Sequence, residues 1–493
     1  MKANSRPNPA PLQRTSDAAT FPPRRAPRLK AVVPVRRRTR SSALPESFLF
    51  GVASSDHQSE AYDPRYPDIW DRWEAQTGCA ARGRAVDFWN RYPEDIELAR
   101  SLGCQSYRFS LSWARLEPRP GEFSDEAFDH YRDVIQRIQA AGMEPVITLL
   151  HWVWPLHLED RGGLLADEFP EWFARYAAEV ARRLGDGVRY WVTFNEPNAL
   201  PFGYLKAWGQ KQYSMPPGRD QDAAGQVQDA AKLVRNLFLA HARARQAMQA
   251  IRPEARLGAN PCVLGFPTWF QRWLDRHITR GGSLADWARE EERCETWLPK
   301  RWVPRVLQQL GSISFFANTN WWHLGMAGRL PEFLCPPECV GQHDYVGLDY
   351  YWGISTLKLP HVFQLLEAMD RRFGRAPVWP RGLYHALRHM ANLFPGMDVM
   401  ILENGCPSQV EGITRSEYLR QHLREVVRAR SHGVNVTAYH CWCLTSTCEW
   451  GLECDSNSDF GLYRVDMAGD PALIRVPTVA AHAYRELIAK RGP

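Results

Sequence analysis

Two glutamates stand where strand-like segments end, and as a pair they could do chemistry. Glu196 follows the aromatic and β-branched run 190–195 (YWVTFN) and precedes a proline. Glu403 follows a second apolar run, 398–402 (DVMIL), and precedes Asn-Gly. Each glutamate alone fits a surface carboxylate as well as a functional acid. Two carboxyls that face one another could act as a catalytic pair.

The elements that must position this pair are short β-rich runs that alternate with helix-like stretches. Two helix candidates, 125–142 and 416–433, have apolar residues spaced three and four apart and end at glycine. Near-continuously apolar strands between helices predict parallel pairing, and eight of them predict an α/β fold of the (β/α)8 TIM-barrel type. The strand candidates are 48–55, 106–113, 144–152, 190–197, 255–266, 345–352, 398–405 and 434–442.

The composition changes along the chain and suggests a tail and one domain. Residues 1–45 are rich in Pro, Arg, Ser and Ala without any period, which predicts a disordered basic tail. Residues 46–493 are expected to form a single barrel domain with long loops. The connection between the fifth and sixth strands, at about 266–344, is much longer than the others and rich in Trp and Arg. It is predicted to be an insertion beside the barrel mouth.

Functional residues of such barrels lie at the C-terminal ends of the strands. These ends hold two carboxylates that a barrel is expected to bring face to face, together with an arginine, amides, a histidine and several tryptophans. A Cys/His metal set or a glycine-rich phosphate loop does not accompany them, so neither metal nor organic cofactor is expected. The strand-end residues are Gln58, Arg108, His151, Trp152, Asn195, Glu196, Tyr351, Glu403, Trp442, Glu449 and Trp450.

Five motifs at these strand ends resemble glycoside hydrolase family 1, the β-glucosidase family, over about residues 48–488. They are YRFSLSW at 107–113, HW at 151–152, TFNEP at 193–197, LENG at 402–405 and HCWCLTSTCEW at 440–450. The resemblance implies a retaining β-glycosidase that hydrolyses β-D-glucosides or closely related β-glycosides, either small-molecule or oligosaccharide, through a covalent glycosyl-enzyme intermediate. It implies that Glu196 is the acid/base and Glu403 the nucleophile.

The same resemblance assigns supporting roles to the other strand-end residues. Arg108 and Tyr351 would keep Glu403 ionised, and Asn195 would hydrogen-bond the sugar 2-OH. Trp442 would form a stacking floor beneath the sugar. The sugar hydroxyls would be bound by Gln58, His151, Trp152, Glu449 and Trp450.

Several positions depart from the family pattern. Asp349 stands where the family usually has Asn, and it could add negative charge beside the catalytic pair. Residues 446–448 read Ser-Thr-Cys in place of a usual Asp-Asn-Phe. Two alternatives to hydrolysis therefore stay open. One is a transglycosidase that uses a small-molecule acceptor, favoured by the Trp-rich insertion, and the other is a non-catalytic glycan-binding relative.

Charge and composition limit which partners and which cellular compartment are expected. The chain has a formal charge of +6, but residues 1–40 hold eleven Lys/Arg against one acidic residue, so the remainder is at −4. A nucleic-acid partner is therefore not expected. Without a run of 18 apolar residues, neither is a membrane span. Eleven Cys without paired zinc spacing suggest thiols in a reducing compartment, and the start of the chain lacks a secretory apolar stretch. A cytoplasmic location is expected.

Overall fold

A computed structural model describes residues 43–206, 212–267, 269–271, 320–355, 360–369 and 371–493. The chain divides into two units, 1–37 and 38–493, and the description below concerns the second. The predicted tail lies outside the described residues apart from its last three positions. Residues 272–319 of the predicted insertion also lie outside them.

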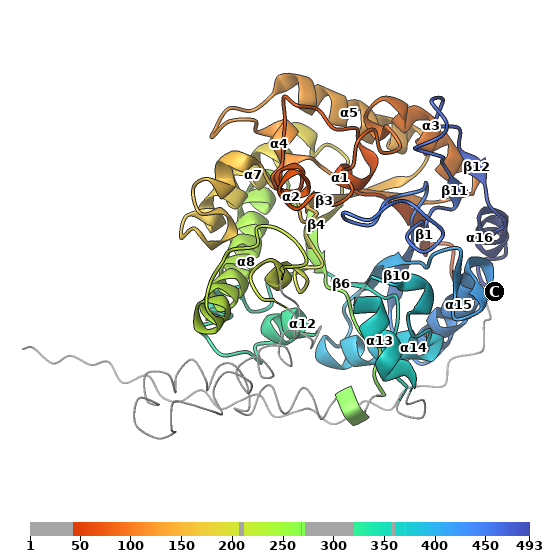
Figure 1. Cartoon of the computed structure of the whole chain (residues 1–493). Helices are drawn as coiled ribbons and strands as arrows, with labels where there is room; N and C mark the ends of the chain where they lie inside the picture. The colour runs from red at the N-terminus through yellow and green to blue at the C-terminus, as the bar shows by residue number, and fades with distance from the viewer. Residues whose placement is uncertain (1–42, 207–211, 268, 272–319, 356–359, 370) are drawn as a thin grey trace, which may run out of the picture. The chain divides into compact units, whose positions relative to one another are not determined.

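Eight parallel strands form one sheet that curls into a barrel (Figure 1). Neighbours in the sheet follow the order β5-β4-β3-β2-β1-β10-β7-β6, so the first and last strands of the barrel pair with one another. The predicted (β/α)8 fold is confirmed. The strands are β1 (Leu49–Ala53), β2 (Ser106–Ser110), β3 (Glu144–Leu150), β4 (Tyr190–Asn195), β5 (Arg256–Asn260), β6 (Val346–Asp349), β7 (Val399–Asn404) and β10 (Val436–Trp442).

The barrel closes between β5 and β6 through a few isolated bonds, which we call the β5–β6 seam. The amide of Asp344 donates to the Leu257 carbonyl at 2.8 Å near one end. At the other end the Asp349 amide donates to the Pro261 carbonyl at 3.0 Å, and the Val263 amide donates to the Asp349 carbonyl at 2.8 Å. Asp349 therefore sits at the junction that completes the barrel.

Helices cover the outside of the barrel, as the alternating pattern predicts (Figure 1). The predicted helices at 125–142 and 416–433 are α5 and α15. Each begins at a hydroxyl cap, with Ser124 Oγ and Thr414 Oγ1 accepting a backbone amide. The α-helices are α1 (Asp56–Ser59), α2 (Ile69–Thr77), α3 (Phe88–Ser101), α4 (Trp113–Leu116), α5 (Asp125–Ala140), α6 (Leu156–Glu159), α7 (Phe169–Leu184), α8 (Ala223–Ile251), α12 (Trp321–Met326), α13 (Pro360–Met369), α14 (Pro380–Leu393), α15 (Arg415–Ser431) and α16 (Val479–Lys490).

Short elements fill the connections at the barrel ends. Antiparallel pairs join β8 (Gln409–Val410) to β9 (Ile413–Thr414) and β11 (Tyr463–Arg464) to β12 (Val476–Pro477). The 3-10 turns are η1 (Gly163–Leu165), η2 (Leu200–Gly203), η3 (Pro337–Cys339) and η4 (Phe373–Arg375). In the described ranges, none of the helices is both long and apolar enough to cross a bilayer.

Two apolar layers hold the barrel together. Inside it, Val146, Val192 and Met400 belong to a small buried cluster. Outside it, a much larger cluster joins the outward strand residues to the helices. The helix α7 is an example of how the helices join this cluster. Its buried residues, which include Phe169, Phe173 and Tyr176, recur at helical spacing and form one apolar face. The strands therefore present side chains to a core on both sides, and the polar residues collect at the strand ends.

Candidate active site

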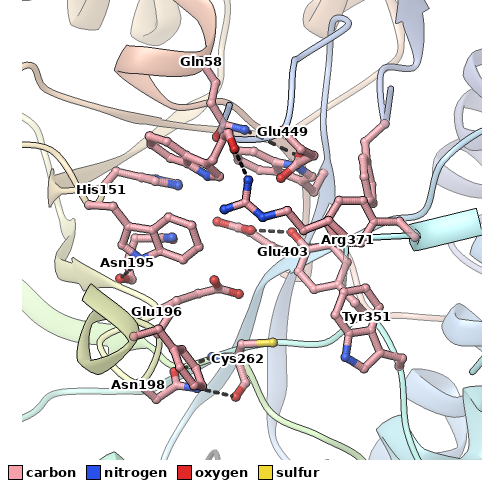
Figure 2. A pocket seen from close by; sticks show the side chains of 18 of the residues that line it. Gln58, His151, Asn195, Glu196, Asn198, Cys262, Tyr351, Arg371, Glu403 and Glu449 are labelled. Atoms are coloured by element: carbon pink, nitrogen blue, oxygen red, sulfur yellow. Dashed lines mark hydrogen bonds between the residues drawn. The ribbon is translucent and has the colours of Figure 1, made fainter. Parts of the chain in front are cut away.

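A cavity of about 300 Å³ opens where the C-terminal ends of the strands meet (Figure 2). Ten of the eleven strand-end residues predicted from the sequence line it. The eleventh, Arg108, is fully buried in β2 and hydrogen-bonds two of the lining residues. The lining residues among those predicted are Gln58, His151, Trp152, Asn195, Glu196, Tyr351, Glu403, Trp442, Glu449 and Trp450.

The carboxyl groups of Glu196 and Glu403 point toward one another across the cavity (Figure 2). One oxygen of each lies within 4.8 Å of the other and of an oxygen of Asp349. Retaining glycosidases place their two carboxyls roughly 5–5.5 Å apart, whereas inverting ones leave roughly 6.5–9.5 Å for a water molecule. The separation fits the retaining arrangement. Glu196 has a backbone φ of +36°, a conformation that is uncommon for non-glycine residues.

Both oxygens of Glu403 accept strong hydrogen bonds. Arg108 Nη1 donates to Oε1 at 2.5 Å, and the Tyr351 hydroxyl donates to Oε2 at 2.5 Å. A bond from a guanidinium is strongest when the acceptor is ionised. These two partners therefore stabilise a negative charge on Glu403 and leave its carboxylate aimed into the cavity.

Glu196 has the opposite electrostatic setting. It is buried, and burial together with the nearby charge of Glu403 raises its pKa to about 8. The neighbouring Cys262 side chain lowers the pKa of Glu196, but its effect is smaller than those of burial and of Glu403. Glu196 consequently holds a proton at neutral pH, beside a Glu403 whose two oxygens accept from Arg108 and Tyr351. Two carboxyls whose environments separate their protonation states can act as acid and nucleophile.

The side-chain oxygen of Asn195 accepts two hydrogen bonds from buried side chains. It accepts from Arg108 Nη2 at 2.6 Å and from Asn260 Nδ2 at 2.7 Å. Asn260 also donates to Asp349 Oδ2 at 2.5 Å. The amide nitrogen of Asn195 makes no hydrogen bond to the described residues. It is left to donate to a ligand in the cavity.

The wall opposite Glu196 combines polar groups with stacked rings. Gln58 Nε2 donates to the Cys448 carbonyl at 3.2 Å and approaches Glu449 Oε1 at 3.5 Å. Trp442 Nε1 approaches the same oxygen at 3.5 Å. Burial raises the pKa of Glu449 to about 7. The wall therefore presents a carboxyl, an amide and an indole plate, which is the make-up of a sugar subsite.

His151 and Trp152 complete this side of the cavity. Burial and the charge of Arg108 hold the pKa of His151 well below its ordinary value, so its imidazole is neutral. Its ring stacks on Trp442 with centroids 5.7 Å apart. Trp152 has a backbone φ of +65°, and its Nε1 donates to the Asn195 carbonyl at 3.1 Å. The indole of Trp450 lies 5.1 Å from that of Trp152.

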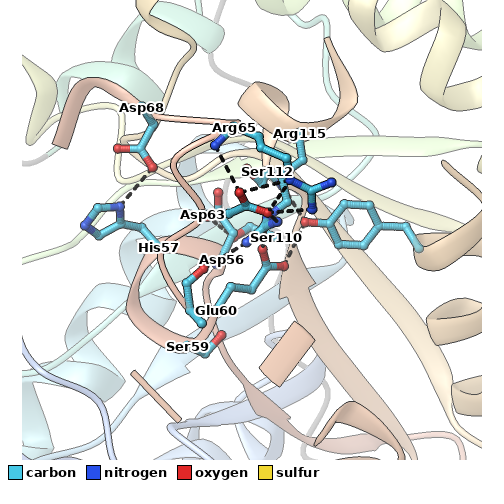
Figure 3. A network of polar contacts seen from close by, with 12 residues as sticks. Asp56, His57, Ser59, Glu60, Asp63, Arg65, Asp68, Ser110, Ser112 and Arg115 are labelled. Atoms are coloured by element: carbon cyan, nitrogen blue, oxygen red, sulfur yellow. Dashed lines mark hydrogen bonds and ion pairs between the residues drawn. The ribbon is translucent and has the colours of Figure 1, made fainter. Parts of the chain in front are cut away.

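A buried polar network fixes the short helix α1, which carries Gln58 (Figure 3). Ser110 Oγ donates to Asp56 at 2.6 Å. Two groups donate to Glu60, namely Arg115 Nε at 2.9 Å and the Tyr131 hydroxyl at 2.7 Å. A single turn of helix has little stability of its own. These side-chain bonds therefore hold the turn that brings Gln58 to the cavity.

The imidazole of His57, also in α1, lies behind the cavity wall. Its Nδ1 is 3.0 Å from Asp68 and its Nε2 is 2.9 Å from Glu74. Although burial opposes the charge, Asp68 and the hydrogen bonds to both carboxylates raise the pKa of His57 to about 9. The ring stacks on Trp450 at 5.5 Å. An imidazolium therefore supports the face of Trp450 that is turned away from the cavity.

The model of glycosyl hydrolase family 1 matches residues 40–263 and 365–493, which is more than half of the chain. The chain belongs to this family. It is therefore a glycoside hydrolase, as the strand-end motifs predict. The stretch that the family model leaves unmatched, 264–364, includes the predicted insertion between β5 and β6.

Relatives align over almost their whole lengths. A 1,4-beta-D-glucan glucohydrolase of Thermotoga neapolitana is 25% identical over 91% of this chain and 98% of its own length. A coniferin beta-glucosidase of Pinus contorta is 27% identical over 90% and 91%. A solved structure, the beta-glucosidase from Thermotoga maritima in complex with deoxynojirimycin, superposes with a TM-score of 0.71 at 23% identity, over 92% of this chain and 100% of that one. That last likeness shows the barrel fold.

The outer part of this family 1 site was not predicted. Its residues are mostly apolar and lie in loops or short helical segments, where no motif marks them. Trp352 could have been predicted, because it directly follows Tyr351 at the end of a predicted strand. Arg371 extends into the cavity and donates to the carbonyls of Trp450 and Ser214. The lining residues missed are Asn198, Ala199, Phe202, Cys262, Leu264, Trp352, Leu365, Arg371, Phe373 and Phe460.

Proposed function

We propose that this family 1 protein is a retaining β-glycosidase that hydrolyses β-D-glucosides or closely related β-glycosides. One observation carries the proposal: Glu196 and Glu403 face one another with oxygens within 4.8 Å, and Glu403 accepts from Arg108 and Tyr351 while burial raises the pKa of Glu196. The names of the aligned relatives, a glucohydrolase and beta-glucosidases, support glucosides as the substrate class and hydrolysis as the reaction.

In the first step, Glu403 attacks the anomeric carbon while Glu196 gives its proton to the leaving oxygen. The glycosidic bond breaks and a covalent ester to Glu403 forms. This ester removes the charge of Glu403, which is one cause of the raised pKa of Glu196. The pKa of Glu196 therefore falls, and its carboxylate can take a proton from water in the second step. The water attacks the same carbon and releases the sugar with retention.

The other residues hold the sugar and stabilise the transition state. The amide nitrogen of Asn195 is proposed to donate to the 2-OH, a bond that strengthens as the oxocarbenium-like state forms. Arg108 and Tyr351 keep Glu403 ionised and aimed. The sugar hydroxyls are proposed to contact Gln58, His151, Trp152, Glu449 and Trp450, above Trp442 as the stacking surface.

Covalent trapping tests this assignment. Incubation with 2,4-dinitrophenyl 2-deoxy-2-fluoro-β-D-glucoside should label the peptide that contains Glu403, because the fluorine slows both steps while the good leaving group lets the first proceed. Glu403→Gln should prevent labelling. Glu196→Gln is the matched control and should keep it, since this leaving group needs no acid. A folded wild type that gives no label and turns over no gluco-, galacto- or fuco-configured substrate would instead be a glycan-binding protein.

The domain organisation and the compartment are part of the proposal. Residues 46–493 are proposed to be one catalytic domain with an insertion at about 266–344, and residues 1–45 a dispensable basic tail. Pairing of β1 with β10, which joins both ends of this range in one sheet, supports a single domain. The ten described cysteines are free thiols, which supports a cytoplasmic location. Deleting residues 1–42 should leave kcat/KM unchanged, and cell fractionation should recover activity in the cytoplasm.

A further inference from the structure

Three buried carboxyl groups meet at the bottom of the cavity. One oxygen each of Glu196, Asp349 and Glu403 lies within 4.8 Å of the others. Asp349 is completely buried, and its Oδ1 has no hydrogen-bond partner among the described residues. The guanidinium of Arg108 is the cation beside this cluster, and it donates to Glu403. A further ionised carboxylate here would be a buried charge without a counter-charge, which is strongly unfavourable.

We propose that Asp349 works as a neutral carboxylic acid that positions the Asn195 amide through Asn260. Asp349 is a positioning residue, because two hydrogen bonds separate it from the group that is proposed to touch the substrate. The proposal rests on the function proposed above. A protonated carboxyl has the shape of an amide, with one acceptor oxygen and one donor, so it can replace the Asn that the family usually has at this position.

Counting hydrogens and lone pairs supports this chain of contacts. Asn260 Nδ2 has two hydrogens, which it gives to Asn195 Oδ1 at 2.7 Å and to Asp349 Oδ2 at 2.5 Å. Asn195 Oδ1 accepts from Asn260 and from Arg108, so both of its lone pairs are used. Turning the Asn195 amide over would break both bonds. Its NH2 group therefore stays directed to the cavity, where the proposed mechanism requires a donor to the 2-OH.

The groups that face Asp349 favour its neutral form. Burial and the charge of Glu403 raise its pKa well above the ordinary value, and Glu196 acts in the same direction. Arg108 opposes them, but its guanidinium is bound to Glu403 and Asn195. The facing titratable and charged groups are Arg108 on β2, Glu196 after β4, Cys262 after β5, Tyr351 after β6 and Glu403 on β7.

The pH profile of Asp349→Asn tests the charge state. Cellobiose is the substrate, because its poor leaving group needs the proton of Glu196. If Asp349 is neutral, the variant changes no charge near Glu196 and the alkaline limb of kcat/KM keeps its wild-type position. If Asp349 is ionised, removing a charge within 4.8 Å moves the limb about 2.5 pH units toward acid, for an effective dielectric constant of about 20. That shift would overturn the proposal. The exposed Glu97→Gln on α3 controls for a general charge effect.

Asn260→Ala tests the path through Asn195. The variant should lower kcat/KM for 4-nitrophenyl β-D-glucoside about ten- to a hundredfold, as expected for one misplaced hydrogen bond to the transition state. For the 2-deoxy analogue the loss should be much smaller, because no 2-OH is present. Asn236→Ala on α8 is the matched control, since this buried asparagine donates to the backbone carbonyls of Leu164 and Ala166 away from the cavity. Equal losses of Asn260→Ala on both substrates would overturn the positioning role.

Infrared difference spectra separate this proposal from the proposed function. At neutral pH the wild type minus Asp349→Asn spectrum should contain the carbonyl band of a protonated carboxyl group. A carboxylate signal in its place overturns the neutral state, whether or not the protein hydrolyses glucosides. If the carboxyl band is present while trapping at Glu403 fails, the charge state holds and the glycosidase function is the part refuted.

Discussion

The proton on Glu196 reduces the stability of the folded protein, and Glu196→Gln should show by how much. The ordinary pKa of a glutamate in the unfolded chain is about 4.5, and in the folded protein burial and Glu403 raise it to about 8. A raised pKa contributes stability that is fully present below pH 4.5 and lost as the pH rises to about 8. At pH 7 the folded protein keeps a proton that the unfolded chain has released. At about 1.4 kcal/mol per pH unit, this costs about 3 kcal/mol.

Glutamine has nearly the same shape and no proton to lose. Glu196→Gln should therefore raise the free energy of unfolding by about 3 kcal/mol at pH 7 and by about 5 kcal/mol above pH 8. At pH 4 the variant and the wild type should be equally stable. Urea unfolding, followed by tryptophan fluorescence at pH 4, 5.5, 7 and 8.5, measures the difference. The exposed Glu97→Gln should give no comparable trend.

The result that refutes this reasoning is a stability difference that does not change with pH. A variant less stable than the wild type at pH 7 would refute it as well, and would mean that Glu196 is ionised in the folded state. If the prediction holds, Glu196→Gln stabilises the fold and at the same time lowers activity on substrates whose poor leaving groups need a proton. The site would then be an example of function maintained against stability.

Three further outcomes are expected. In a pH–rate profile for cellobiose, kcat/KM should fall about tenfold per pH unit above about pH 8, because Glu196 loses its proton. A profile that stays flat to about pH 9.5 would contradict this. Arg108→Met should leave Glu403 as an unpaired buried charge and lower stability by about 3–5 kcal/mol at pH 7 in thermal unfolding. The raised pKa of His57 contributes stability below pH 6.5 that is lost through about pH 9, so the deficit of His57→Gln should shrink by about 3 kcal/mol across that range. A constant deficit would assign His57 to packing alone.

The fold could be predicted because eight apolar runs alternate with helical patterns. Several predicted strands, however, extend beyond the C-terminal ends that the structure has. The candidates 106–113 and 255–266 end in the structure at Ser110 and Asn260. The residues beyond are apolar or aromatic because they pack at the barrel mouth or line the cavity, and not because they belong to the sheet. A pattern of apolar residues alone does not distinguish these two environments.

The inner site was predictable from the chemistry at strand ends, whereas its supports and outer wall were not. Asn260 lies opposite Asn195 only because β5 pairs with β4 in one register, and a single sequence carries little information on that register. Arg371 comes from a loop without periodicity and meets Trp450 and Ser214, which are distant in sequence. Such contacts depend on how the closed barrel brings loops together.

The order of strands in the sheet has a consequence for assembly of the enzyme. Glu196 belongs to the first half of the chain and Glu403 to the second, and the halves join where β1 pairs with β10 and at the β5–β6 seam. Both junctions link segments far apart in sequence, and such pairings form slowly in folding. Turnover during refolding should therefore return later than helical circular dichroism. In this barrel, activity reports that the ring of strands has closed, which spectroscopic measures of secondary structure do not detect.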